Sequence, residues 1–146
     1  MSDPEVRPPA SARRRVALLG PLHPWRGGLA QFLQLLGDAL EAHAEVRAVT
    51  FTRQYPDFLF PGTSQFDADA PRPRYPTEAL LDSIGPLSWR RTAAHLERFA
   101  PGVVVLKWWM PFFGPAFASS VGPLRRRGAP GLRRSRSCST ASDITR

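Results

Sequence analysis

The residues best placed for chemistry lie in the first quarter of the chain, where Gly27 and Gly28 stand directly before a run with helical spacing. Glycine leaves the backbone open, so a phosphate can approach the free N–H groups at the start of a helix, where the dipole also favours negative charge. The pair therefore predicts a phosphate site. A tight turn into the helix would explain it equally well, because the segment matches neither G-x-G-x-x-G nor G-x-x-x-x-G-K-[ST].

The same loop carries His23, Trp25 and Arg26, which add polar and aromatic groups beside the glycines. A single histidine in a loop is more often solvated than catalytic, so the pattern assigns it no catalytic role. The chain has one cysteine, Cys138, which excludes an internal disulfide and a metal site built from cysteines.

The elements that position this loop are a strand and a helix. Residues 16–19 form a short apolar run closed by Gly20, which predicts a buried strand. From Leu29 onward the apolar residues recur with the spacing of an amphipathic helix, at Leu29, Phe32, Leu33, Leu36 and Leu40. Residues 45–52 are rich in valine and threonine and predict a second strand, so the three elements make a βαβ unit of a parallel sheet.

The second half of the domain repeats this alternation after a long proline-rich segment. Residues 53–86 have no sustained period and predict a loop, part of which packs through its aromatic side chains, with a short helix around 77–83. Residues 87–99 predict a helix capped by Ser88, and residues 103–106 are apolar on both faces, which is typical of a central parallel strand. Residues 117–127 predict a last helix, interrupted at Gly122 and Pro123. We therefore expect a three-layer, Rossmann-like α/β domain with a mostly parallel sheet.

Length and composition fit one globular domain of 146 residues, 42% of them hydrophobic. No apolar run approaches the ~18 residues of a membrane span, and the run after the N-terminal arginines is too short for a signal peptide, so a cytoplasmic location is expected. The net charge of +8 is concentrated at the end, because residues 124–146 contain seven arginines and one acid. A nucleic-acid interpretation therefore depends on this tail alone.

Four segments in order resemble the N-terminal domain of GT-B glycosyltransferases, the retaining family 4 (group 1) kind. They are PLHPWRGGLAQFLQLL, RQYPDFLFPG, LDSIGPLSW and VVVLKWWMPFFGPAF, and the similarity covers roughly residues 17–128. It implies the first half of a GT-B fold: an acceptor-side, Rossmann-like domain over residues 16–128, followed in the family by a second domain that holds most of the nucleotide-sugar.

The resemblance also implies the site. Gly27 and Gly28 would meet the phosphates of the donor, and His23, Arg26 and the 107–113 segment, with Lys107 and Trp109, would line the cleft. No residue is assigned a catalytic role, and neither a cofactor nor a bound metal is expected. The partners would be a nucleotide-sugar donor and a glycan or lipid-linked acceptor, in glycan or cell-envelope synthesis, with peripheral membrane association compatible with that role.

The chain departs from the family after residue 128. Residues 1–15 predict a disordered lead-in and residues 129–146 a disordered basic tail, where the family would have another apolar strand and then the donor domain. One interpretation is that the tail is translated out of frame, since codons compatible with its amino acids, read one base later, can spell Val-Phe-Val-Val-His-Asp. A fragment without the donor domain is expected to be inactive alone. Two alternatives stay open: a non-catalytic phosphate-binding module and, less favoured because we expect no nucleic-acid partner, a protein that binds nucleic acid through this tail.

Overall fold

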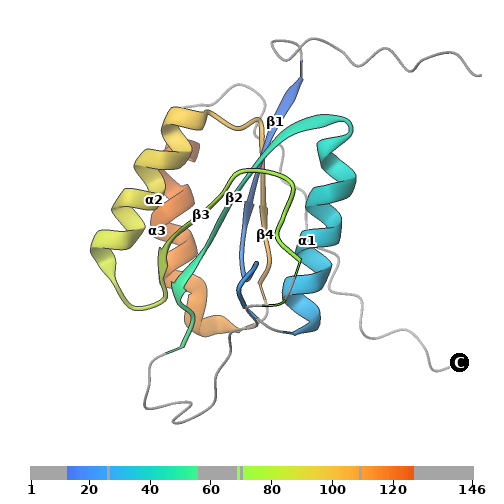
Figure 1. Cartoon of the computed structure of the whole chain (residues 1–146). Coiled ribbons are helices and arrows are strands. Elements are labelled where there is room, and N and C mark those ends of the chain that lie inside the picture. The colour runs from blue at the N-terminus through green and yellow to red at the C-terminus, as the bar shows by residue number, and fades with distance from the viewer. Residues whose placement is uncertain (1–12, 26, 56–68, 70, 109, 127–146) are drawn as a thin grey trace, which may run out of the picture.

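The computed structural model describes residues 13–25, 27–55, 69, 71–108 and 110–126 (Figure 1). Both predicted disordered ends, apart from residues 13–15, lie outside this part of the chain, as do residues 56–68 of the predicted loop. The described elements follow in the order β1 (Arg14–Leu19), α1 (Gly28–Glu41), β2 (Ala44–Arg53), β3 (Thr77–Asp82), α2 (Pro86–Phe99), β4 (Val103–Leu106), the 3-10 turn η2 (Pro111–Phe113) and α3 (Gly114–Arg126).

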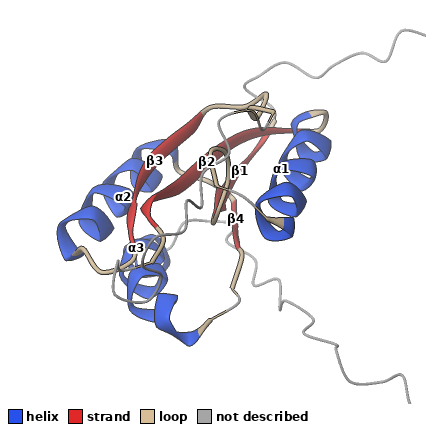
Figure 2. Cartoon of the chain, turned by 60° about the horizontal axis from the view of Figure 1, so that its bottom comes forward, coloured by secondary structure: helices blue, strands red, loops and turns tan. Residues whose placement is uncertain are grey.

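The strands form one parallel sheet in the order β3-β2-β1-β4 (Figure 2). β1 lies in the middle and pairs with β2 on one side and with β4 on the other. β1 starts at Arg14, inside the segment predicted to be a disordered lead-in, because Arg14 pairs with Ala44 of β2. The chain therefore leaves β1 toward β2 and later returns to its other side, which is the arrangement that opens a ligand crevice at the carboxyl ends of the strands.

Helices cover both faces of the sheet, which confirms the three-layer, Rossmann-like α/β prediction (Figure 1). One core lies between the sheet and α1, with Leu18 and Leu33 fully buried. The other lies between the sheet and the pair α2 and α3, and contains Phe51, Leu96 and Phe117. Each face of the central strands is thus sealed, as an all-parallel sheet requires.

The buried stripe of α1 agrees in part with the predicted one. Leu33 is buried, and Leu36 and Leu40 pack partly buried against the same core. Phe32 departs from the prediction because it is 53% exposed, and Ala30 and Gly37 are buried in addition. Gly37 belongs to the stripe because the ring of Tyr75 occupies the space where a Cβ would stand. The apolar spacing located the helix and most of its core-facing side, and close packing against an aromatic ring brings Gly37 into the buried stripe.

The predicted short helix around residues 77–83 is wrong, because this segment is strand β3. Its backbone groups are satisfied by parallel pairing with β2, in which Ala48 lies opposite Thr77 and Arg53 opposite Asp82. A six-residue segment holds too little pattern to distinguish the two states, and the available partner strand decides between them.

Three further predictions need correction. β4 is the edge strand of the described sheet, not a central one. α3 begins at Gly114 and continues through Gly122 and Pro123 instead of breaking there. The N-cap of α2 is Gly85, with Pro86 in the first turn, where proline needs no N–H partner.

Ser88 has a different role from the predicted cap. Its Oγ accepts a hydrogen bond from the Asp82 N–H at 2.9 Å and donates to the Gly85 carbonyl at 2.6 Å, so that it joins the end of β3 to α2. No helix in the described part of the chain is long and apolar enough to cross a membrane.

Candidate functional site

The loop between β1 and α1 is fixed on the carboxyl edge of the sheet by three hydrogen bonds to β2. Gly20 N–H donates to the Val49 carbonyl at 3.2 Å, Leu22 N–H to Thr50 Oγ1 at 3.0 Å, and Trp25 Nε1–H to the Phe51 carbonyl at 2.8 Å. Leu22 and Trp25 are buried as well. The loop is therefore anchored to β2 just before the start of α1.

The N-terminus of α1 is open to an incoming group. Gly27 is the N-cap with a φ of 113°, a conformation that favours glycine, and no side chain of the described residues caps the helix. The first intrahelical hydrogen bond of this turn runs from Gln31 N–H to the Gly27 carbonyl at 3.1 Å, so the N–H groups of residues 28–30 have no place in the helical ladder. A Cβ built on Gly27 or Gly28 meets no described residue within 4 Å, and the first turn carries no acidic residue.

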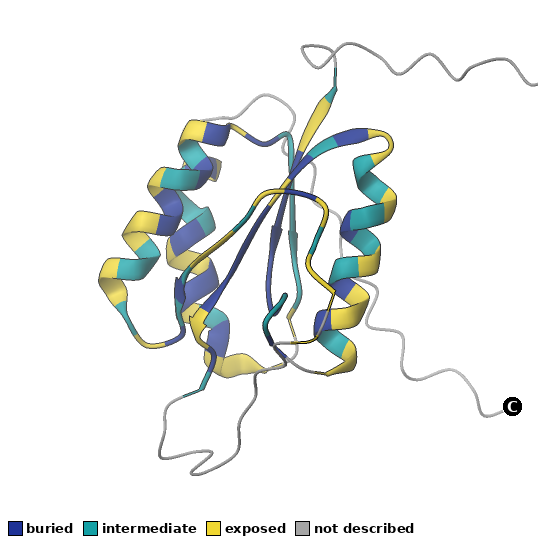
Figure 3. Ribbon diagram, in the orientation of Figure 1, coloured by how far each residue is buried: buried dark blue, intermediate teal, exposed yellow. Residues whose placement is uncertain are grey.

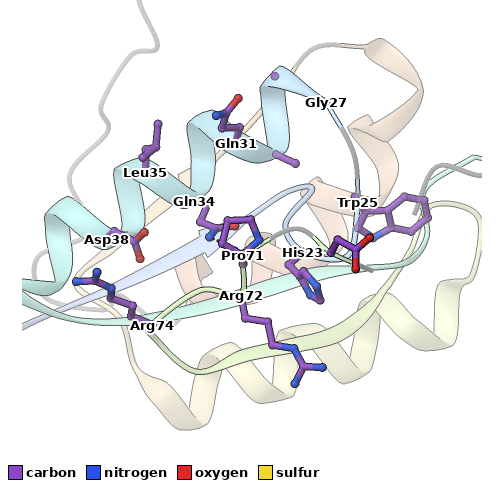
Figure 4. Close-up of a pocket in the computed structure, with 13 residues that line it drawn as sticks. His23, Trp25, Gly27, Gln31, Gln34, Leu35, Asp38, Pro71, Arg72 and Arg74 are labelled. Atoms are coloured by element: carbon purple, nitrogen blue, oxygen red, sulfur yellow. Dashed lines mark hydrogen bonds between the residues drawn. The ribbon is translucent and has the colours of Figure 1, made fainter. Parts of the chain in front are cut away.

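A cavity of about 700 Å³ extends from this terminus along α1. One wall is the outer flank of α1, and the other is formed by residue 69 and the segment leading into β3 (Figure 4). Its lining residues are His23, Trp25, Gly27, Gly28, Ala30, Gln31, Gln34, Leu35, Asp38, Asp69, Pro71, Arg72 and Arg74. The volume is of the size that holds a small organic ligand.

The two ends of the cavity differ chemically. His23 and Arg72 lie at the end that contains Gly27, and Asp38 and Arg74 lie at the other end (Figure 4). The first end combines open backbone N–H groups with an imidazole and a guanidinium, which suits an anion. The second end offers both a carboxylate and a guanidinium, which can accept from and donate to polar groups such as hydroxyls.

The wall opposite α1, formed by residue 69 and residues 71–74 and called the far wall below, is held to α1 by two contacts between residues distant in sequence. Gln34 Nε2 donates a hydrogen bond of 2.8 Å to the Pro71 carbonyl, and the Tyr75 hydroxyl donates to the Gln34 carbonyl at 3.5 Å. The Tyr75 ring lies against Gly37, and Tyr75 is 4% exposed. These contacts place Arg72 and Arg74 opposite the helix.

Two polar atoms on cavity-lining residues are buried and have no hydrogen-bond partner among the described residues. They are His23 Nε2 and Asp38 Oδ1. An unsatisfied polar group costs about 1–3 kcal/mol, so both atoms favour a bound group that supplies the missing hydrogen bond. Burial, followed by the nearby Asp38 carboxylate, raises the pKa of the Tyr75 phenol above its ordinary value, so Tyr75 stays neutral beside this end of the cavity.

The predicted site residues fall into three groups. Gly27, Gly28 and His23 line the cavity together. Lys107 does not line it: its Nζ lies 4.5 Å from the centre of the Phe32 ring, on the other flank of α1. Arg26 and Trp109 lie outside the described residues.

Sequence reasoning missed the residues of the far wall and of the helix flank. Arg72, Arg74 and Asp38 line the cavity, but no local motif marked them. The one available signal is the alternation of arginine and proline over residues 71–74, which places two cations in a segment with restricted backbone freedom.

Comparisons with protein-family models, with curated proteins and with solved structures give no match to this chain.

Proposed function

We propose that this chain is the acceptor-side domain of a GT-B glycosyltransferase and that its cavity binds a nucleotide-sugar by its phosphates at Gly27 and Gly28. One observation carries the proposal: a helix N-terminus with two glycines, which no described residue caps or obstructs, opens into a cavity at the carboxyl edge of a parallel sheet. Ligands of open α/β sheets bind at this edge.

The charges at this end of the cavity support a phosphate over a neutral group. The positive end of the α1 dipole is not neutralised by an acidic residue in the first turn. Arg72 lines the same cavity, as does the acidic residue Asp69. His23 Nε2 is a further unsatisfied group at the same end. Such a set would stabilise the charge that develops on a departing nucleoside diphosphate, which is the main electrostatic demand of sugar transfer.

The other end of the cavity suits a polyhydroxylated group. Asp38 and Arg74 lie at this end of the cavity (Figure 4). From residue 28 to residue 38 the helix rises about 15 Å, at ~1.5 Å per residue, so a phosphorylated sugar could contact both ends. No residue is assigned as a catalytic base or nucleophile.

Calorimetric titration of the full chain with UDP-glucose and GDP-mannose tests this proposal. We expect both to bind, whereas uridine and guanosine, which lack phosphate, should bind at least about tenfold more weakly. Arg72→Gln should weaken the nucleotide-sugars without changing nucleoside binding, and Arg90→Gln, an exposed arginine on α2 that does not line the cavity, is the matched control. Equal affinity for nucleoside and nucleotide-sugar would exclude a phosphate site.

A phosphate-binding module without chemistry is the second candidate, because the same cavity would serve it. The two functions separate on the product: a transferase releases a nucleoside diphosphate from the donor, and a binding module leaves the donor intact. A coupled assay for nucleoside diphosphate release, run beside the titration, distinguishes them.

A further inference from the structure

The two edges of the sheet are built differently. β3, at one edge, carries the charged side chains Glu78 and Asp82, and its register with β2 is irregular. β4, at the other, is Val-Val-Val-Leu, with no charge or proline, and its register with β1 is regular. Proteins blunt exposed edges with charges, prolines and bulges, so β3 is protected and β4 is not.

β4 is apolar and partly exposed on both of its faces. Val103 and Val105 pack toward the core beneath α1, and Val104 and Leu106 toward the core beneath α2 and α3, yet all four are only half-buried (Figure 3). Among the described residues, no strand pairs with the outer edge of β4. An occupant of this edge must therefore be apolar on both faces.

Exposed aromatic side chains border β4 at its carboxyl end, one on each face of the sheet. Phe32 of α1 is 53% exposed and contacts Lys107, and Trp108 is 54% exposed and lies against Phe117 of α3. Together they extend the apolar surface beyond the strand itself. Exposed apolar side chains beside an unprotected strand edge are typical of an interaction site.

The hydrogen-bond pattern identifies an extended strand as the occupant. Lys107 N–H donates to the Leu19 carbonyl of β1 at 3.0 Å. Because backbone groups alternate in direction along a strand, the N–H and C=O groups of Val105 also face β1, and those of Val104 and Leu106 face outward. A row of outward groups is satisfied by another strand that adds to the sheet.

We propose that the outer edge of β4 pairs antiparallel with β4 of a second copy of this chain, about a two-fold axis at Val105. In this register Val104 lies opposite Leu106 of the second copy, and both pairs of outward groups are used. The register centred on Val104 instead requires Gly102, whose N–H already donates to the Arg15 carbonyl at 2.9 Å.

Self-complementarity identifies the second copy as the occupant. β1 begins with two arginines, β2 carries Arg47, and β3 carries two acids, so among the described strands β4 alone is uncharged and apolar on both faces. Lys107 would lie opposite Val103 of the second copy, so no like charges meet. The pairing is isologous and closes as a dimer. This inference goes beyond the proposed function and does not depend on it.

A disulfide test uses the two-fold axis. Residues directly opposite in a non-hydrogen-bonded antiparallel pair have Cα atoms about 4.5 Å apart, within the range of a disulfide. In a Cys138→Ser background, Val105→Cys should therefore oxidise to a covalent dimer with itself. Ala79→Cys, an exposed position on β3 at the opposite edge, is the control and should give at least about tenfold less dimer at the same protein concentration.

Sedimentation of the full chain without substitutions provides the second measurement. We expect a monomer–dimer equilibrium that Trp108→Ser shifts toward monomer, while Leu87→Ser, an equally apolar change at a 70% exposed position of α2, leaves it unchanged. A monomer at every concentration, or crosslinking of Ala79→Cys as strong as that of Val105→Cys, would overturn the proposal. A complex with another protein in place of the dimer would overturn it as well.

Discussion

Gly28→Asp should make the protein more stable and, at the same time, weaken its binding of nucleotide-sugars. Gly28 is the first residue of α1, and a Cβ there meets nothing within 4 Å, so the new side chain fits without repacking. A carboxylate in the first turn of a helix stabilises it by about 0.3–1 kcal/mol through the dipole. The expected rise in melting temperature is about 1–4 °C for a domain of this size.

The effect on binding has the opposite sign because the carboxylate occupies the place proposed for the phosphate. Two unit charges about 5 Å apart repel by roughly 0.8 kcal/mol in bulk water and roughly 3 kcal/mol at an effective dielectric constant of 20. A diphosphate with two negative charges doubles these values, and 1.4 kcal/mol corresponds to a factor of ten in affinity. We therefore expect UDP-glucose to bind Gly28→Asp at least about tenfold more weakly.

Gly28→Asn is the matched control, since asparagine has almost the same size and no charge. Calorimetric titration with UDP-glucose and thermal unfolding of both variants separate charge from bulk. If Asn and Asp weaken binding equally, the effect is steric and the charge argument is wrong. If both variants bind like the unsubstituted chain, the ligand does not contact the N-terminus of α1 and the proposed phosphate site is wrong.

Three further predictions concern the contacts that hold the far wall of the cavity and the β3–α2 joint. Gly37→Ala should lower the free energy of unfolding in urea by about 1–3 kcal/mol because its Cβ overlaps the Tyr75 ring. In a Tyr75→Ala background the same substitution should instead raise the free energy of unfolding by up to about 1 kcal/mol through helix propensity. If the sign does not reverse, the Tyr75 ring does not lie against Gly37. In a Tyr55→Phe variant, which leaves Tyr75 as the single tyrosine, ultraviolet titration should show phenol ionisation above its usual pKa of about 10. Since that pKa is raised in the folded state, stability should be constant below pH ~10 and fall as the pH rises further, and Tyr75→Phe should reduce this alkaline loss. Ser88→Ala should cost about 1 kcal/mol, because it leaves the Asp82 N–H without its partner.

The elements that sequence predicted well are those with a complete local pattern. α1 and α2 have long apolar periods, and β1 and β2 are rich in apolar and β-branched residues. β3 was missed because only its pairing with β2 makes it a strand. A break in α3 was predicted because Gly122 and Pro123 argue against a continuous helix, but burial of Ser120 and Leu124 in the core beneath α2 and α3 outweighs that local preference.

The site divides in the same way. Gly27 and Gly28 could be found because a glycine pair directly before a helix is recognisable from neighbouring residues in the sequence, without knowledge of tertiary contacts. Arg72 and Asp38 could not, because they become neighbours of the same cavity through the Gln34–Pro71 hydrogen bond and the Tyr75–Gly37 contact, each of which joins residues more than thirty positions apart. A pattern read along the chain contains no information about such pairings.

The two proposals of this structure occupy opposite flanks of α1, and this separation makes each a control for the other. The cavity lies on the flank that carries Gln31 and Asp38, and the β4 edge lies on the flank that carries Phe32. Gly28→Asp should therefore leave the monomer–dimer equilibrium unchanged, and Trp108→Ser should leave nucleotide-sugar affinity unchanged. If Trp108→Ser weakens nucleotide-sugar binding, the ligand extends across the helix terminus toward Lys107, as the family resemblance implies for the cleft. In that case ligand and second copy would compete for one surface, and adding UDP-glucose should dissociate the dimer.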